Sequence, residues 1–145
     1  MIVVLDASVI VKLLVEDPAN ESDTDQAFAL LSAISEGQFR IIQPVHWLAE
    51  VAAVAARLTP KSAVRKVAML SAMEFPTSGE TTVMQRAVQL AVATGQHLFD
   101  TLYHAVALEH PDAWLVTADD RYRLQAEHFG RIAALEHWTR ILGRP

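Results

Sequence analysis

Ile2-Val3-Val4-Leu5-Asp6, near the amino terminus, is a short β-branched apolar run that ends abruptly in a carboxylate. Continuous apolar runs of this length are typical of strands that are buried on both faces of a parallel sheet. A second such run, Trp114-Leu115-Val116-Thr117, is followed closely by Asp119. Open parallel sheets bind their ligands at the carboxyl ends of the strands. If these two strands are neighbours, Asp6 and Asp119 therefore meet at one edge of the sheet.

Helical and extended segments alternate along the rest of the chain. Apolar periodicity, caps and terminating glycines or prolines predict helices over residues 24–36, 45–58, 59–73 and 81–94, and one that begins near Asp100 and ends before Pro111. Short apolar runs predict further strands over residues 39–43, 74–77 and 132–135. Strands separated by helices indicate an α/β fold with a central, mainly parallel sheet. We expect residues 1–145 to form a single domain.

The apolar faces of two predicted helices follow from the spacing of their apolar residues. On the helix 24–36 the face consists of Ala27, Phe28, Leu31 and Ile34. On the helix 45–58 it consists of Trp47, Leu48, Val51, Val54, Ala55 and Leu58. Glu50 falls off this second stripe, one turn from His46. We expect Glu50 to point into the crevice at the sheet edge.

Composition narrows the class of protein. Apolar residues make up 52% of the 145 residues, which is enough for a buried core. The chain has no cysteine, which excludes disulfides, thiolate zinc sites and a cysteine nucleophile. No signal-peptide pattern and no run of about 20 apolar residues is present. We therefore expect a soluble, cytoplasmic protein that does not span a membrane.

The formal net charge of −5 argues at first against a nucleic-acid partner, because phosphate backbones attract basic surfaces. The charge is unevenly distributed, however. Basic residues predominate near the carboxyl terminus, at Arg121, Arg123, Arg131, Arg140 and Arg144. Two interpretations stay open for this basic tail, namely a contact with phosphates and an ordinary solvated surface.

Four carboxylates fall where the crevice of an α/β sheet would collect them: Asp6, Glu50, Asp100 and Asp119. Clustered carboxylates repel one another unless a cation joins them. Oxygen ligands suit hard ions such as Mg²⁺ or Mn²⁺. Such an ion lowers the pKa of a bound water and stabilises charge on a phosphate. The pattern therefore predicts a metal site that binds a phosphate of the substrate. A negative net charge is compatible with such a site.

Each acid also has a simpler explanation when it is taken alone. Asp6 would cap the turn after its strand, Asp100 would be a helix N-cap, and Asp119 with Asp120 would begin a turn. Glu50 would be solvated, as most glutamates are. The joint pattern favours a shared site.

Four motifs in order resemble those of PIN-domain nucleases. They are Val4-Leu5-Asp6-Ala7-Ser8, His46-Trp47-Leu48-Ala49-Glu50-Val51, Phe99-Asp100-Thr101-Leu102-Tyr103-His104-Ala105 and Val116-Thr117-Ala118-Asp119. Among PIN proteins, this short chain is most similar to the VapC-type toxins of VapBC toxin–antitoxin pairs. The resemblance covers nearly the whole chain and implies a PIN-like three-layer domain, with a central parallel sheet flanked by helices.

The resemblance also implies a function and a set of residue roles. The expected activity is cleavage of RNA with Mg²⁺ or Mn²⁺. Asp6, Asp100 and Asp119 would hold the metal, and Glu50 would bind it directly or through water and orient the attacking water. Ser8 and Thr117 would steady the carboxylates with their hydroxyls. The implied partners are a second copy of the chain and a VapB-type antitoxin. Asp120 directly follows Asp119, and the Thr-x-Asp register favours Asp119 as the fourth acid.

Other readings of the acids remain as alternatives. A phosphotransfer receiver domain would show an acidic pair after the first strand and a lysine after the last. A phosphatase with an aspartate nucleophile would have Asp-x-Asp where this chain has Asp6 and Ser8. Within the PIN class, a housekeeping RNA-processing nuclease and a non-catalytic interaction module are possible, although the latter would be expected to lack one of the acids. Stacking on bases stays open for Trp138, whereas Trp47 and Trp114 have core-like surroundings.

Overall fold

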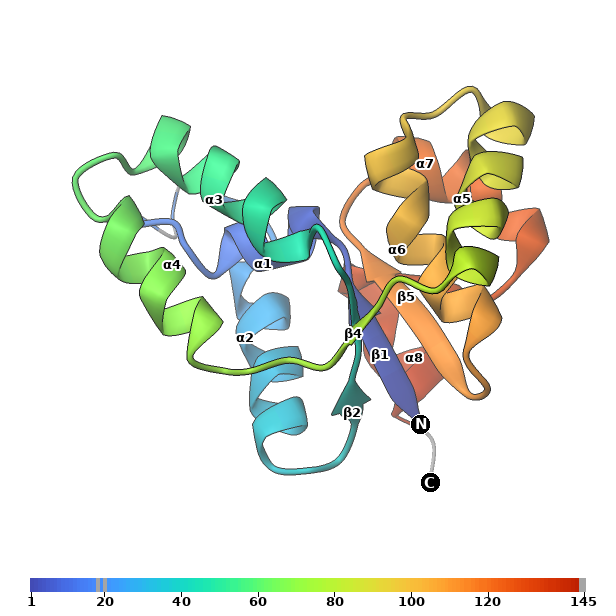
Figure 1. Cartoon of the computed structure of the whole chain (residues 1–145). Coiled ribbons are helices and arrows are strands. Elements are labelled where there is room, and N and C mark those ends of the chain that lie inside the picture. Colours follow the sequence, from blue (N-terminus) through green and yellow to red (C-terminus); the bar gives the residue numbers. More distant parts are fainter. Residues whose placement is uncertain (18, 20, 144–145) are drawn as a thin grey trace.

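The computed structural model describes residues 1–17, 19 and 21–143, so Arg144 of the basic tail lies outside the described residues. Within the described part, the central sheet has four strands in the order β2-β1-β5-β6 (Figure 1). Every neighbouring pair in this sheet is parallel. The strands are β1 (Ile2–Leu5), β2 (Arg40–Ile41), β5 (Ala113–Thr117) and β6 (Ile132–Ala134). The predicted α/β fold with a parallel central sheet is confirmed.

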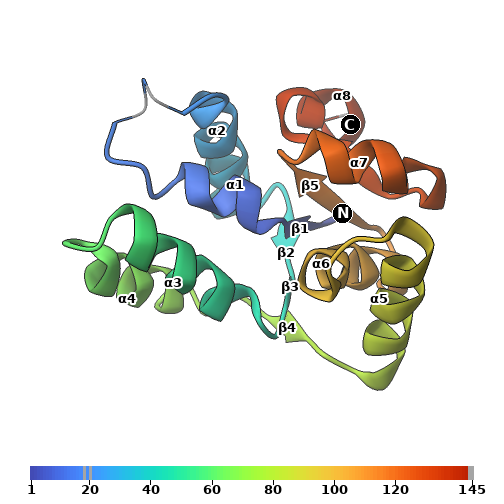
Figure 2. The ribbon, with the colours of Figure 1, turned by 90° about the horizontal axis from the view of Figure 1, so that it is seen from above.

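Helices flank this sheet on both sides. They are α1 (Ala7–Lys12), α2 (Thr24–Ser35), α3 (Trp47–Leu58), α4 (Ala63–Ser71), α5 (Thr81–Thr94), α6 (Leu98–Glu109), α7 (Asp120–Ala126) and α8 (Trp138–Leu142). Two short 3₁₀ turns, η2 (Glu127–Phe129) and η3 (Leu135–His137), lie before and after β6. Figures 1 and 2 show α1 to α4 on one side of β1 and α5 to α7 on the other.

The strand order of the central sheet reverses at β1. From β1 the chain first crosses to β2 on one side and later returns to β5 on the other side. The register pairs Ile2 with Ala113 and Leu5 with Val116, so both strands end at the same edge. Parallel α/β sheets bind ligands at such a reversal point, outside the carboxyl ends of the strands. The expected adjacency of the strands that precede Asp6 and Asp119 is therefore confirmed.

The carboxyl end of β1 is held by a buried side chain in place of a longer β2. β2 has only two residues, so the ladder beside Leu5 is incomplete. The Gln43 side chain fills the gap, since its Oε1 accepts from Leu5 N at 2.8 Å and its Nε2 donates to Leu5 O at 2.9 Å. Gln43 is fully buried, where an unpaired amide would be costly. This contact fixes the backbone immediately before Asp6.

Two strand predictions were right in place but wrong in extent. The predicted strand 39–43 is split into β2 and β3 (Gln43–Pro44), and β3 pairs with β4 (Thr77–Ser78) in a separate two-stranded sheet. Pro44 has no N–H to donate to a ladder, which suits the end of a short edge pairing. The predicted strand 74–77 shifts to β4 because Gln43 N bonds the carbonyl of Pro76 and draws the segment after it into register.

The helix predicted from Thr59 begins later, at Ala63, because Thr59 ends α3 instead. Its N–H and its hydroxyl both donate to the carbonyl of Ala55. The helix expected near Asp100 begins earlier, at Leu98, with His97 as its N-cap.

The predicted faces of α2 and α3 are partly wrong. The buried stripe of α2 runs through Ala27, Leu30 and Ala33, whereas Phe28 is 51% exposed. On α3, Trp47, Val51 and Ala55 are buried, but Leu58 is 55% exposed. In both helices the sequence offers more apolar residues than the contact with the core covers. Trp138 is buried in the core, so its ring is not available to stack on a base.

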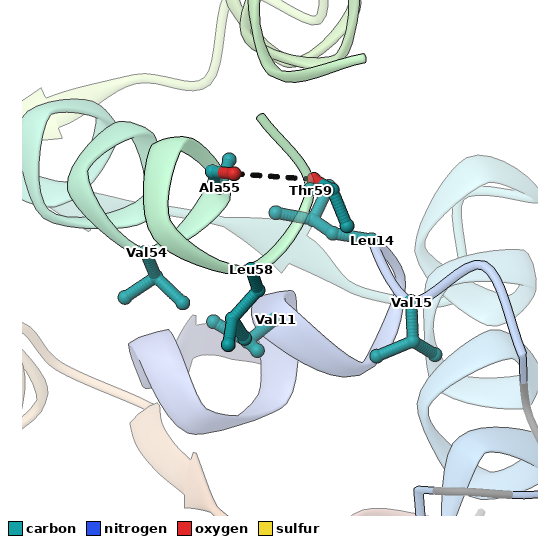
Figure 3. Close-up of a pocket in the computed structure, with 7 residues that line it drawn as sticks. All are labelled: Val11, Leu14, Val15, Val54, Ala55, Leu58 and Thr59. Carbon is teal, nitrogen blue, oxygen red and sulfur yellow. Dashed lines mark hydrogen bonds between the residues drawn. The ribbon is translucent and has the colours of Figure 1, made fainter. Parts of the chain in front are cut away.

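The packing of α1 against α3 leaves a small apolar hollow of about 10 Å³ (Figure 3). This is barely the space of one water molecule. Its one polar side chain, Thr59, uses its hydroxyl on the carbonyl of Ala55 at 3.2 Å. The hollow therefore offers no chemistry.

None of the helices in the described part of the chain has the length and apolar character needed to cross a membrane.

Candidate functional site

Asp6 stands at the N-cap position of α1, directly after β1, but its side chain makes no capping hydrogen bond. Instead, its Oδ2 accepts from Ser8 Oγ at 2.5 Å and from Thr117 Oγ1 at 2.8 Å. Thr117 is the last residue of β5, so the second bond joins the ends of the two central strands. Among the described residues, no protein group donates to Oδ1. One Asp6 oxygen is thus fixed and the other is left for a ligand.

The two hydroxyls also hold the turn that follows β5. A hydroxyl has one proton to donate and lone pairs to accept with. Having donated to Asp6, Ser8 Oγ accepts from Ala118 N and Thr117 Oγ1 accepts from Asp119 N, each at 3.0 Å. The backbone at Asp119 is therefore positioned relative to Asp6 by two side chains that sequence analysis had singled out.

Asp119 is exposed and caps α7, where its Oδ1 accepts from Tyr122 N at 3.0 Å. The capping role weighed for this residue is present, and it engages only one of the two oxygens. Asp120 is the first residue of α7, and its side chain is 70% exposed and paired with Arg123 at 3.1 Å. The charge of Asp119 raises the pKa of Asp100, so Asp119 lies near Asp100.

Asp100 is the third residue of α6 and does not cap it. The cap is His97, whose Nδ1 accepts from Phe99 N at 3.2 Å. Within the described residues, no hydrogen bond engages the Asp100 carboxylate. Its pKa is raised, mainly by burial and then by the charge of Glu50. The side chain is thus partly desolvated, close to another acid and without a neutralising contact.

Glu50 lies one turn into α3 and points inward rather than into bulk water. Its Oε2 accepts from Tyr103 Oη at 2.7 Å and lies 3.2 Å from His46 Nε2. Tyr103, on α6, is fully buried, and burial followed by the Glu50 charge raises the pKa of its hydroxyl. In the described part of the chain, no group donates to Glu50 Oε1. Glu50 therefore bridges two helices with one oxygen and presents the other.

Sequence analysis missed Tyr103 and gave His46 no role. Tyr103 follows Asp100 by three residues, which places both on one face of α6. That spacing could have identified it. Tyr122, which was also missed, is buried on α7, and its hydroxyl lies 3.0 Å from His104 Nδ1. Burial, followed by the charges of Asp6, Asp100 and Asp119, raises the pKa of Tyr122.

The structure brings the four acids into one electrostatic neighbourhood. The pKa of Asp6 is raised to about 6 by burial, against the bonds from Ser8 and Thr117, and the charges of Glu50 and Asp100 add to the rise. Glu50 and Asp119 act on Asp100 in the same sense, and the imidazoles of His97 and His46 oppose them. Like charges held together at low solvation call for a counter-ion.

A hard divalent cation fits this donor set by chemistry. Asp6, Glu50 and Asp119 each present one carboxylate oxygen without a protein donor among the described residues, and Asp100 presents two. Carboxylate oxygens are the preferred protein ligands of Mg²⁺ and Mn²⁺. As the side chains stand, no group of three or more acidic or histidine side chains in the described residues is close enough to hold one ion. Binding therefore requires the carboxylates to close on the cation.

A family model described as PIN domain matches residues 3–127, which include all four acids. A comparison with curated proteins gives no match. The family match excludes the two alternatives of a receiver domain and a phosphatase with an aspartate nucleophile.

Neutralising Asp6 should stabilise the metal-free protein at neutral pH. The pKa of Asp6 is raised from 3.8 to about 6, so the folded state binds this proton more tightly than the unfolded state. The contribution of Asp6 to the free energy of unfolding is therefore greatest at pH values below its pKa in the unfolded state. It falls as the pH rises through the pKa of Asp6 in the folded state. At 1.36 kcal/mol per unit, the ionised carboxylate costs at most about 3 kcal/mol.

Urea unfolding in EDTA measures this effect. Asp6→Asn should raise the free energy of unfolding at about pH 8, and its advantage over the wild type should vanish near pH 4. Asp120→Asn, which removes an exposed carboxylate, should change stability little. A less stable Asp6→Asn protein at the higher pH would contradict the description of this site.

Proposed function

The chain belongs to the PIN-domain family, a family of generally metal-dependent nucleases, and on this basis we propose that it is an endoribonuclease that hydrolyses RNA phosphodiester bonds with Mg²⁺ or Mn²⁺. The observation that carries the proposal is the convergence of Asp6, Glu50, Asp100 and Asp119 at the point where the strand order reverses. Their free oxygens and mutual repulsion are what a divalent cation would satisfy.

Each residue has a role in this proposal. Asp6, Asp100 and Asp119 would hold the cation. When bound, the cation supplies a Lewis acid that stabilises negative charge on the scissile phosphate and acidifies a water. Glu50, fixed through Oε2 by Tyr103, orients the attacking water with Oε1. Ser8 and Thr117 are positioning residues that keep Asp6 in one orientation.

The basic tail contributes less to RNA binding than its composition suggests. Arg123 is paired with Asp120 and Glu127. Arg131 donates to the backbone carbonyls of Ala107 and His110. The guanidinium groups of Arg123 and Arg131 are therefore engaged in contacts with other residues of the chain. Arg121 and Arg140 are exposed, so within the described part of the basic tail these two are left for contacts with phosphates.

Cleavage of a mixed RNA pool by the purified protein tests the proposed activity. Cleavage should require Mg²⁺ or Mn²⁺ and stop in EDTA. Removing a group that acts on the reacting phosphate should lower the rate by at least about 100-fold, so Asp100→Asn and Asp119→Asn should both be nearly inactive.

Asp120→Asn is the matched control, since it removes the adjacent carboxylate without touching the proposed site. It should cleave at close to the wild-type rate. Equal loss in Asp119→Asn and Asp120→Asn would refute the choice of Asp119. Wild-type activity in Asp100→Asn would refute the proposed site.

We further propose that the nuclease is the toxin of a toxin–antitoxin pair and acts on cytoplasmic RNA. An apolar groove supports a protein partner. It has a volume of about 560 Å³ and lies between α2 and α4, where Phe28 is 51% and Met69 62% exposed. Arg65 also lines it. Such a groove suits the apolar face of an amphipathic antitoxin helix that carries an acidic residue at its edge.

Growth of bacteria that express the chain alone tests the toxin role. Wild-type protein should arrest growth, and Asp6→Asn should not. Co-expression of the antitoxin from an adjacent gene should restore growth for the wild type but not for Met69→Glu, which places a charge in the groove. Harmless expression of an enzyme that cleaves RNA in vitro would contradict the toxin role and indicate a housekeeping RNA-processing nuclease. Restoration of the Met69→Glu strain would refute the groove as the antitoxin site.

We also propose a homodimer that forms through α5. Val83, Ala87 and Leu90 bury one face of this helix, while on the opposite face Val88 is 48% and Val92 81% exposed. Val88 and Val92 form a stripe without a charged residue. The one charged residue of α5 is Arg86, and it pairs with Glu109. A two-fold interface places the same patch on both copies, so an uncharged stripe avoids like-charge repulsion.

Sedimentation of the wild type and of Val88→Glu measures the oligomeric state. The wild type should sediment as a dimer and the variant as a monomer, because the new charges would face each other across the two-fold axis. A monomeric wild type at high micromolar concentration would contradict the proposal.

The single-domain proposal for residues 1–145 rests on continuity of the core. The PIN match ends at residue 127, but β6 pairs with β5, and Leu135, Trp138 and Leu142 belong to the same hydrophobic cluster as β1.

A further inference from the structure

An aromatic side chain is exposed beside the carboxylates. Phe99 directly precedes Asp100 in the first turn of α6, and 51% of it is exposed. Two imidazole rings lie against it, that of His46 at a centroid distance of 5.3 Å and that of His97 at 5.0 Å. Exposed apolar surface has no stabilising role in the folded monomer. The exposed part of the ring is therefore accessible to a ligand.

The backbone of Phe99 is fixed from both sides. Its N–H donates to His97 Nδ1 at 3.2 Å, and its carbonyl accepts from His46 Nε2 at 2.9 Å. The His46 ring also packs edge-on against Tyr103 at 5.0 Å. His46, which lies beside Glu50 Oε2, is thus also one of the two residues that hold the backbone of Phe99. A ring held in this way is preorganised for a planar ligand.

This aromatic surface borders the proposed reaction site. His46 Nε2 lies 3.2 Å from Glu50 Oε2. Both His46 and His97 are near enough to Asp100 to act on its carboxylate. A group that rests on Phe99 therefore lies next to a phosphate held at the carboxylates.

We propose that Phe99, bracketed by His46 and His97, is a stacking subsite for one nucleobase of single-stranded RNA next to the scissile phosphate. The inference rests on the proposed ribonuclease function and adds a determinant of substrate class. Bases in an RNA helix are stacked on their neighbours, whereas those of single strands and loops are free to stack on aromatic side chains. Every base has a π-face, so the subsite selects an unpaired strand rather than a particular base.

Binding of a fluorescent single-stranded RNA tests the subsite without cleavage. The assay uses Glu50→Gln protein with Mg²⁺, which lacks the water-orienting carboxylate but keeps the three aspartates proposed to hold the cation, and a second RNA of the same length that has abasic residues around the cleavage position. Phe99→Leu should weaken binding of the intact RNA by about 10-fold or more. It should leave binding of the abasic RNA unchanged, and Phe99→Trp should bind the intact RNA at least as well as Phe99 does. Phe129→Leu, which alters another exposed ring next to a histidine, should have no effect.

The outcomes separate this inference from the proposed function. Unchanged binding in Phe99→Leu, or equal weakening for intact and abasic RNA, would overturn the stacking subsite and leave the nuclease proposal standing. If Phe99→Leu weakened binding of a protein partner and left binding of RNA unchanged, the ring would belong to a protein interface. That result would overturn the subsite as well. Failure of the protein to bind RNA with Phe99 intact would refute the RNA function and the subsite with it. With active enzyme, Phe99→Leu should raise KM and leave kcat nearly unchanged.

Discussion

The parallel pairing of β1 with β5 is the constraint on which the rest of the site depends. It ends two distant segments at one edge of the sheet, and the Thr117 hydroxyl then joins them by donating to Asp6. Gln43 completes the β1 ladder from the other side. At the same edge, α3 and α6 bring Glu50 and Asp100 close enough for their charges to raise the pKa of Asp6. Loss of this pairing would separate Asp6 from Asp119.

The same arrangement explains why the site is electrostatically unfavourable without a ligand. Burial, together with the charges of Glu50 and Asp100, raises the pKa of Asp6 to about 6 against two hydroxyl donors. A fold selected for stability alone would place apolar or neutral groups at this edge. Keeping several partly desolvated carboxylates with free oxygens costs stability, and a divalent cation offsets that cost only when it binds. Such a cost is usual at functional sites, which accords with the role proposed for these acids.

The sequence made much of this architecture predictable, because its strongest signals are local. The runs before Asp6 and Asp119 are short, apolar and sharply ended, and Gly95 ends α5 in the left-handed conformation that favours glycine. What could not be predicted depends on tertiary contacts. The amide of Gln43 replaces backbone pairing, and the exposure of Phe28 depends on which residues α2 meets. Tyr103 could have been predicted from its spacing to Asp100. The orientation of Phe99, in contrast, depends on two histidines from separate segments.

The most direct test of the central claim is to locate Mn²⁺ by anomalous scattering in crystals of the protein soaked with the ion. We expect one principal peak among the carboxylates of Asp6, Asp100 and Asp119, within reach of Glu50 or of a water that it holds, and no such peak in Asp6→Asn crystals. The proposed metal site would be wrong if saturating Mn²⁺ bound elsewhere on the protein, or did not bind, although the same preparation cleaves RNA.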